Sequence, residues 1–318
     1  MEAVAVIILT FNAGSEFKDL LDAINQQNMT FAYRLVIDSG STDRTVYEAN
    51  SAGFEVVRVN NSDFDHGATR QLAVEICPKA DFFVFLTQDA IPVNRRSISN
   101  LMKVFNEQSV GIAFGRQVPK RDASVLGAHA RLYNYTTFSY VRSYSDRIKY
   151  GIKTVACSNS FAAYRKTALN DVQGFPKKVI FGEDVITAGR MLLKSWKIAY
   201  VAEAGVYHSH NYNPIQEFRR YFDIGAFHTA NRWLLDHFGK PQNEGVKYLR
   251  SELLYVFQNN ILLLPMCLLS LAAKWIGYNF GVKSKFFPLW INRMLSSQPK
   301  YWKEHRDKMT SNDAHNYK

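Results

Sequence analysis

The apolar segment at residues 82–86 (Phe-Phe-Val-Phe-Leu) is the feature that most constrains how this chain can fold. It shows no alternation of apolar and polar residues, and polar residues border it on both sides. Such a run is typical of a strand buried on both faces of a parallel sheet. Parallel strands present ligand-binding residues at their carboxyl ends, here Thr87, Gln88 and Asp89. A charge at Asp89 must be solvated, paired or bound to a cation, or else Asp89 is an ordinary turn residue before Pro92.

Strand and helix patterns alternate through the first ninety residues. Residues 3–11, 34–38 and 54–59 are further strand patterns, and the apolar spacing of residues 17–24 predicts an amphipathic helix. This alternation predicts an α/β fold, with a mostly parallel sheet and helices on both faces. The residues that follow the strands then share one sheet edge. Besides Thr87, Gln88 and Asp89, they are Thr10, Phe11, Asn12, Asp38 and Ser39.

Two common nucleotide-binding folds are excluded because their glycine-rich motifs are missing from the sequence. A dinucleotide-binding fold needs G-x-G-x-x-G in the first turn so that pyrophosphate can approach bare backbone, and this turn has only Gly14. The sequence also has no P-loop motif. Residues 66–70 (His-Gly-Ala-Thr-Arg) faintly resemble the glycine-rich signature of sugar nucleotidyltransferases, but in those enzymes it follows the first strand rather than the third. A sugar nucleotidyltransferase is therefore an alternative only.

Composition and charge indicate the compartment and the partners. The three cysteines are too far apart for a metal knuckle or a C-x-x-C pair, and the first residues lack a signal-peptide pattern, so we expect a cytoplasmic protein. The net charge of +11 predicts an anionic partner. We find no nucleic-acid-binding motif and expect no nucleic-acid partner. Basic residues mixed with Trp, Tyr and Phe in the last third are typical of a membrane surface.

The segment 253–277 is the most apolar part of the chain, and Lys274 is its only charge. Its uninterrupted apolar part, residues 261–273, is shorter than the ~20 residues that cross a bilayer. We therefore predict an interfacial or buried helical hairpin rather than a membrane span. The alternative is that these residues pack on the catalytic domain or on a second subunit.

Four features of the second half carry candidate chemistry. Glu183 and Asp184 open a predicted helix, where they either cap free N–H groups or provide a proton acceptor in a cleft. His208 and His210 point the same way in an extended segment, and one of them could complete a metal site with Asp89. The tyrosine- and arginine-rich residues 122–150 predict either a helix pair or the wall of an acceptor pocket. Residues 155–164 are predicted as a strand, with Asn159 at its centre.

In this order, these motifs resemble the inverting glycosyltransferases of family 2, which have the fold called GT-A (Rossmann-like). The resemblance rests on T-F-N at 10–12, D-S-G-S-T-D at 38–43, the acidic motif ending at Asp89, G-E-D at 182–184 and the late His208. Within the family, the chain is most similar to bacterial rhamnosyltransferases that build O-antigens and capsules. That similarity is carried by residues 63–70, 85–90, 158–165, 208–212 and 217–228.

The resemblance implies roles for individual residues. Asp184 would be the general base, and Asp89 with His208, preferred over His210, would bind a divalent cation (Mg²⁺ or Mn²⁺). Thr87 stands where many members have the first Asp of the D-x-D motif. The other implied donor contacts, to nucleobase, ribose or diphosphate, are Thr10, Phe11, Asn12, Asp38, Ser39, Arg70 and Gln88.

The resemblance also implies a domain plan and a reaction. Residues 1–215 would form the GT-A nucleotide-sugar-binding and catalytic domain, and residues 216–318 a C-terminal helical, membrane-associating extension. The implied reaction moves L-rhamnose from dTDP-β-L-rhamnose, a dTDP-sugar donor, to a lipid-linked oligosaccharide acceptor, an undecaprenyl-diphosphate-linked glycan. The enzyme would be peripheral on the inner face of the bacterial cell membrane. The same fold with a UDP-hexose donor is the main alternative.

Overall fold

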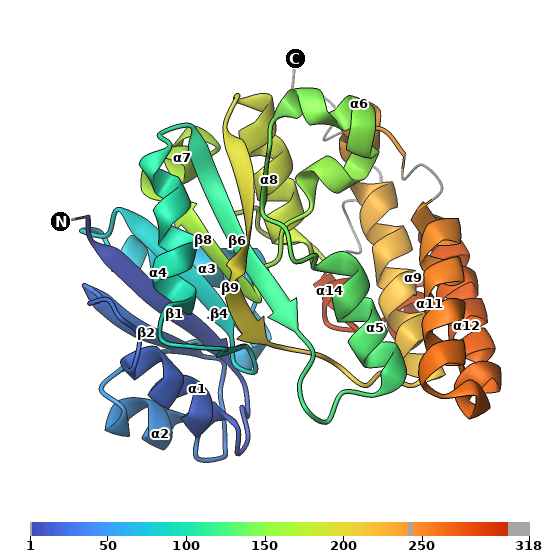
Figure 1. The fold of residues 1–318 in the computed structure, drawn as a ribbon, viewed down its shortest axis with the longest axis horizontal. Coiled ribbons are helices and arrows are strands. Elements are labelled where there is room, and N and C mark those ends of the chain that lie inside the picture. The colour runs from blue at the N-terminus through green and yellow to red at the C-terminus, as the bar shows by residue number, and fades with distance from the viewer. Residues whose placement is uncertain (1, 241–243, 305–318) are drawn as a thin grey trace.

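A nine-stranded sheet forms the centre of the computed structural model, which describes residues 2–240 and 244–304 (Figure 1). Its strand order is β3-β2-β1-β4-β8-β6-β9-β5, and β7 pairs with β9. The first four strands are parallel, as predicted, whereas β8 runs antiparallel between β4 and β6. The sheet is therefore mixed in its second half. The strands are β1 (Val4–Thr10), β2 (Tyr33–Asp38), β3 (Glu55–Arg58), β4 (Phe82–Thr87), β5 (Ile91–Pro92), β6 (Val110–Val118), β7 (Tyr140–Arg142), β8 (Phe161–Arg165) and β9 (Lys197–Tyr207).

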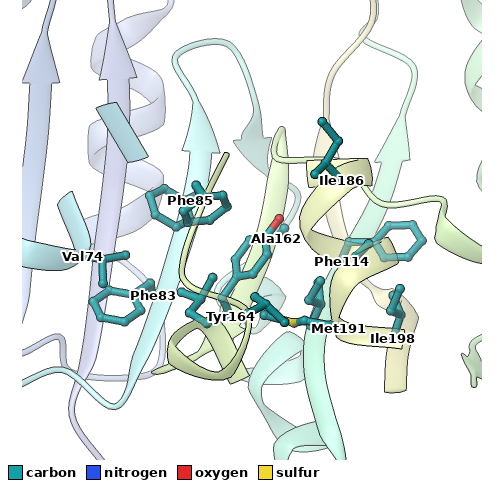
Figure 2. Packing of buried hydrophobic residues seen from close by; sticks show 14 of the residues in the cluster. Val74, Phe83, Phe85, Phe114, Ala162, Tyr164, Ile186, Met191 and Ile198 are labelled. Atoms are coloured by element: carbon teal, nitrogen blue, oxygen red, sulfur yellow. The ribbon is translucent and has the colours of Figure 1, made fainter. Parts of the chain in front are cut away.

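Helices cover both faces of this sheet, as the unalternating strand patterns predict. Side chains of β4 alternate between two hydrophobic cores: Phe82, Val84 and Leu86 enter one, and Phe83 and Phe85 enter the other. Figure 2 shows Phe83 and Phe85 in the second core, with Val74, Tyr164 and Ile186 nearby. The helices of this half are α1 (Phe17–Asn25), α2 (Thr45–Ser51), α3 (His66–Ile76), α4 (Ser97–Met102), α7 (Lys166–Asp171) and α8 (Glu183–Leu193).

The C-terminal helices stand beside the sheet, on the right in Figure 1. The backbones of helices α9 and α12 are in direct contact at Gly281. A Cβ at this position would lie only 1.9 Å from the carbonyl oxygen of Phe222. Phe222 and Phe227 also join a hydrophobic core of the sheet, so the extension is packed onto it. The domain boundary near residue 215 stays a prediction. These helices are α9 (Pro214–Ala230), α10 (Arg232–Phe238), α11 (Glu244–Asn259), α12 (Leu264–Val282), α13 (Leu289–Leu295) and α14 (Tyr301–Glu304).

Two predictions of local structure were wrong. Residues 155–164 are not one strand, since β8 begins at Phe161 and Asn159 lies in the preceding loop. The backbone N–H of Asn159 bonds to a side chain of α8 and is therefore not paired in the sheet. Residues 122–150 are not a helix pair: α5 (Val125–Asn134) is followed by β7, which pairs with β9, and then by the one-turn α6 (Arg147–Tyr150).

Candidate active site

The loops after β1 and β2 lock together through a buried carboxylate. Asp38 accepts hydrogen bonds from the Thr10 hydroxyl (3.0 Å), the backbone N–H groups of Gly40 (3.1 Å) and Ser41 (2.9 Å), and the Ser41 hydroxyl (2.5 Å). The Ser39 hydroxyl donates to the carbonyl of Thr10. The structure thus brings Thr10, Asp38 and Ser39 together, and the contacts of Asp38 fix the loop that follows β2.

An aromatic ring is held at the same sheet edge. The Gln88 side chain bonds to both the N–H and the carbonyl of Phe11 (2.8 and 3.2 Å), whose side chain is 48% exposed. Asn12 adopts a left-handed backbone (φ 45°), and its side-chain oxygen accepts from the N–H of Thr42. A fixed, exposed ring of this kind offers a flat surface on which a nucleobase can stack.

Three side chains from two segments that are distant in sequence form a cluster beyond β4. Potential ligand atoms of Asp89, His208 and His210 all lie within 4.8 Å of one another. Asp89 Oδ1 is 3.4 Å from His208 Nε2, and Asp89 Oδ2 is 3.9 Å from His210 Nδ1. Although burial opposes ionisation of Asp89, the hydrogen bond and charge of His208 and the charge of His210 hold its pKa well below the usual range. The cluster therefore combines an ionised carboxylate with two imidazoles.

Gln117, at the end of β6, orients His208 and was missed in the sequence analysis. Its Oε1 lies 2.9 Å from His208 Nδ1 and also accepts from the Arg131 guanidinium. A guanidinium can only donate, so this atom is the amide oxygen, and His208 must carry its proton on Nδ1. Nε2 then faces Asp89, to which it donates a hydrogen bond when it carries a proton, and without that proton it is the ring atom that can bind a metal. The apolar residues before Gln117 could have indicated a strand end at the cleft.

The cluster fits a divalent cation. One carboxylate and two imidazoles suit Mn²⁺ and similar ions, while Mg²⁺ prefers oxygen ligands alone. The orientation of His208 supports this fit, because Gln117 engages Nδ1 and leaves Nε2 directed at the Asp89 carboxylate.

The first turn of α8 carries Asp184, directly after Glu183. Gly182 precedes it in a left-handed backbone (φ 76°), where a Cβ would also meet the Phe227 ring at 2.8 Å. The Asp184 carboxylate accepts from the N–H groups of Asn159 (3.0 Å) and Val185 (2.8 Å). Burial and the nearby charge of Glu183 raise the pKa of Asp184 to about 7. A carboxylate with this pKa can take up a proton near neutral pH.

Buried hydrogen bonds hold the neighbouring Glu183. Its Oε1 lies 2.9 Å from the Arg70 guanidinium and 2.8 Å from the Asn159 amide nitrogen, and the Tyr164 hydroxyl donates to the other side of that amide (2.6 Å). Arg70 is only 4% exposed, and its guanidinium contacts Glu183. A buried carboxylate stays ionised only when a cation compensates its charge. We therefore assign Arg70 to holding Glu183 ionised beside Asp184.

The site also has a cavity of about 390 Å³, which neither Glu183 nor Asp184 lines. It reaches His210 of the metal-binding cluster and contains Cys157. Burial raises the pKa of the Cys157 thiol, and the charge of nearby Asp184 raises it further. The predicted acceptor wall contributes only in part, since Tyr144, Arg147 and Tyr150 do not line the cavity. The residues of that wall that do line it are Arg131, Tyr133, Tyr135, Tyr140 and Arg142.

The sequence of residues 5–173 matches the family described as "Glycosyl transferase family 2", which covers more than half of the chain. The chain belongs to this family. This glycosyltransferase is 42% identical over 300 residues to the O-antigen chain rhamnosyltransferase RfbN of Salmonella typhimurium, covering 94% of this chain and 96% of that protein. It is 40% identical over 303 residues to the O-antigen chain rhamnosyltransferase WbaN of Salmonella anatum, covering 95% and 96%.

Solved structures of other glycosyltransferases share its fold. The mannosyltransferase PcManGT of Pyrobaculum calidifontis, solved with GDP-Man and Mn²⁺, superposes with a TM-score of 0.53 at 18% identity, covering 94% of this chain and 84% of that one. Residues 1–349 of S. aureus TarS give a TM-score of 0.52 at 17% identity, covering 89% and 91%. The family 2 glycosyltransferase therefore has the predicted GT-A fold.

Proposed function

We propose that this enzyme transfers L-rhamnose, with inversion, from dTDP-β-L-rhamnose to an undecaprenyl-diphosphate-linked glycan in O-antigen or capsule synthesis. The observation that carries the proposal is the similarity to two O-antigen chain rhamnosyltransferases over nearly the full chain. The polar sheet edge, the metal-binding cluster with the cavity that reaches it, and the raised pKa of Asp184 support it.

In this proposal, different residues bind the donor, accept the proton and hold the metal. Thr10, Phe11 and Asn12 and the loop fixed by Asp38 hold the nucleobase and ribose. Asp184 takes the proton from the acceptor hydroxyl, whose oxygen attacks the anomeric carbon from the face opposite the nucleoside diphosphate. The bond to the diphosphate breaks in the same displacement, which inverts the anomeric centre. Asp89 and His208 would hold a divalent cation, which would supply Lewis-acid stabilisation of the departing diphosphate.

Nucleotide binding tests the donor. We expect dTDP with Mn²⁺ to stabilise the enzyme more than UDP with Mn²⁺, measured as the shift in melting temperature. A ligand at 100 times its Kd adds ~2.7 kcal/mol to the free energy of unfolding, which such a measurement resolves easily. A preference for UDP would replace the donor by a UDP-hexose. No shift with either nucleotide would contradict the proposal, and release of pyrophosphate in place of dTDP during turnover would indicate a nucleotidyltransferase.

We further propose that the enzyme sits on the cytoplasmic face of the membrane through α12 and the segment after it. Residues 261–282 are long and apolar enough to cross a membrane by length and composition. One side of α12, however, packs against α9, and Lys274 within it is buried. Leu262, in the turn before α12, and Trp275 on the helix are 85% and 71% exposed, and Lys283 is exposed just after the helix end. An apolar face edged by basic residues favours an interfacial position.

Vesicle binding tests this surface. Replacing Leu262 and Trp275 together by Ser is expected to reduce co-flotation with phosphatidylglycerol vesicles roughly tenfold or more, because both side chains lose apolar area to bury. Tyr47→Ser is the matched control, since Tyr47 is 64% exposed on α2. Equal flotation of the double variant and the wild type would show that this face does not contact lipid.

A further inference from the structure

The C-terminal helices give the cavity a polar wall. Glu217 on α9, Tyr248 on α11 and Lys274 on α12 all line it. They lie outside residues 5–173, the part that matches the family. Helices that pack against one another need only apolar contacts, and α12 is apolar apart from Lys274 within residues 264–277. Charged side chains aimed into a cavity from such helices require a separate explanation.

These side chains surround one ammonium group. Lys274 Nζ lies 3.0 Å from Glu252 Oε1 and 3.3 Å from the Tyr248 hydroxyl, which itself donates to Glu252 (2.9 Å). Glu252 is completely buried, so it and Lys274 satisfy each other. Glu217 is 3.6 Å from Lys274, beyond hydrogen-bond distance. His129 also lies 3.8 Å from Glu252, and Arg220 adds positive charge near Glu217. Glu217 is held less closely than Glu252 and keeps an oxygen to accept hydrogen bonds.

The chemistry of the cavity fits a polyhydroxylated ring. The Glu217 carboxylate and the Tyr248 oxygen can accept from hydroxyl groups, while the Lys274 ammonium donates to them. Tyr133, Tyr135 and Tyr140 also line the cavity and offer aromatic rings against which the C–H faces of a sugar can pack. None of the residues that follow β1 and β2 lines the cavity, which meets the metal-binding cluster at His210. The cavity is thus separate from the polar edge assigned to the nucleotide.

We propose that Glu217, Tyr248 and Lys274 form the subsite that recognises the hydroxyl groups of the acceptor sugar. This inference rests on the proposed function and deepens it. Residues at the sheet edge bind the donor, and residues of the C-terminal helices determine which acceptor sugar is accepted. Helix α12 then has two roles on two sides. Lys274 faces the cavity, while Trp275 and its exposed neighbours face the lipid that carries the acceptor.

Glu217→Gln is the decisive variant, because it leaves the Lys274–Glu252 pair intact. The full-length enzyme is assayed with dTDP-rhamnose and a panel of galactose, glucose, mannose and N-acetylglucosamine, each linked through diphosphate to a phenoxyundecyl chain. We expect kcat/KM for the preferred acceptor to fall roughly 10- to 100-fold through a raised acceptor KM, since a hydrogen bond to a charged group is lost. The KM for dTDP-rhamnose should stay within about twofold, and the order of preference within the panel should change.

Two further variants keep the test decisive. Tyr248→Phe removes one hydroxyl and should raise the acceptor KM about three- to tenfold. If Glu217→Gln does not fold, this variant tests the subsite in its place. Asp236→Asn, an exposed acid on α10, is the matched control and should change neither KM. An unchanged acceptor KM, or an equal rise in both KM values, would overturn the subsite. A wild-type enzyme that releases no dTDP with any acceptor would instead overturn the proposed function, and the subsite with it.

Discussion

Asp184→Asn is expected to lower the transfer rate by about 10²- to 10⁴-fold while dTDP binding stays nearly unchanged. The amide cannot take a proton from the acceptor hydroxyl, but it keeps an oxygen for the N–H of Asn159. The rate is measured as acceptor-dependent release of dTDP, and binding as the shift in melting temperature with dTDP and Mn²⁺. Asp236→Asn, far less buried, is the control for the charge change. An unchanged turnover would refute the assignment of Asp184 as the base.

The raised pKa of Asp184 gives this variant a pH signature. Because that pKa is about 7, the wild-type rate should fall as the pH drops below 7 and the carboxylate becomes protonated. Stability should respond in the opposite sense. The folded-state pKa lies above the ordinary value of 3.8, so wild-type stability decreases as the pH rises from about 4 to 7. The Asp184→Asn variant has no titrating group at this position, so its melting temperature should rise relative to that of the wild type as the pH increases from about 4 to 7. A difference in melting temperature that stays constant over this range would contradict the raised pKa.

Local patterns in the sequence were enough to predict the first half of the fold and its polar edge. The unalternating strands 82–86 and 3–11 demand cover on both faces, and the structure supplies it in two cores. Because the carboxyl ends of parallel strands meet, the positions of Thr10, Asp38 and Asp89 at one edge followed from strand ends alone.

Contacts between distant segments could not be predicted in the same way. Whether Arg70 meets a phosphate or Glu183 depends on how α3 packs against α8, which no local pattern records. Gln117 carries no motif, and its role appears only once β6 and β9 bring it beside His208. Lys274 stood out as the lone charge of an apolar segment, and only the packing of α12 on α9 shows that it points inward.

Asp89→Ala is expected to weaken Mn²⁺ binding by at least about 100-fold and to abolish the Mn²⁺-dependent part of the thermal shift with dTDP. The physical reason is the loss of the carboxylate of the cluster, which leaves two imidazoles and no anionic ligand to hold a divalent ion. Free Mn²⁺ is measured directly by its electron paramagnetic resonance signal, which does not depend on turnover. His237→Ala, on α10, is the control for loss of an imidazole elsewhere.

Gln117→Ala makes this test sharper, because it removes no metal ligand. Without the amide oxygen, the proton of His208 is no longer held on Nδ1, and Nε2 is no longer kept free to face Asp89. Loss of such an orienting partner costs about 10- to 100-fold in metal affinity, so Gln117→Ala should fall between the wild type and Asp89→Ala. Wild-type Mn²⁺ affinity in Asp89→Ala would remove Asp89 from the metal site. Wild-type affinity in Gln117→Ala alone would keep the site but show that His208 is oriented without Gln117.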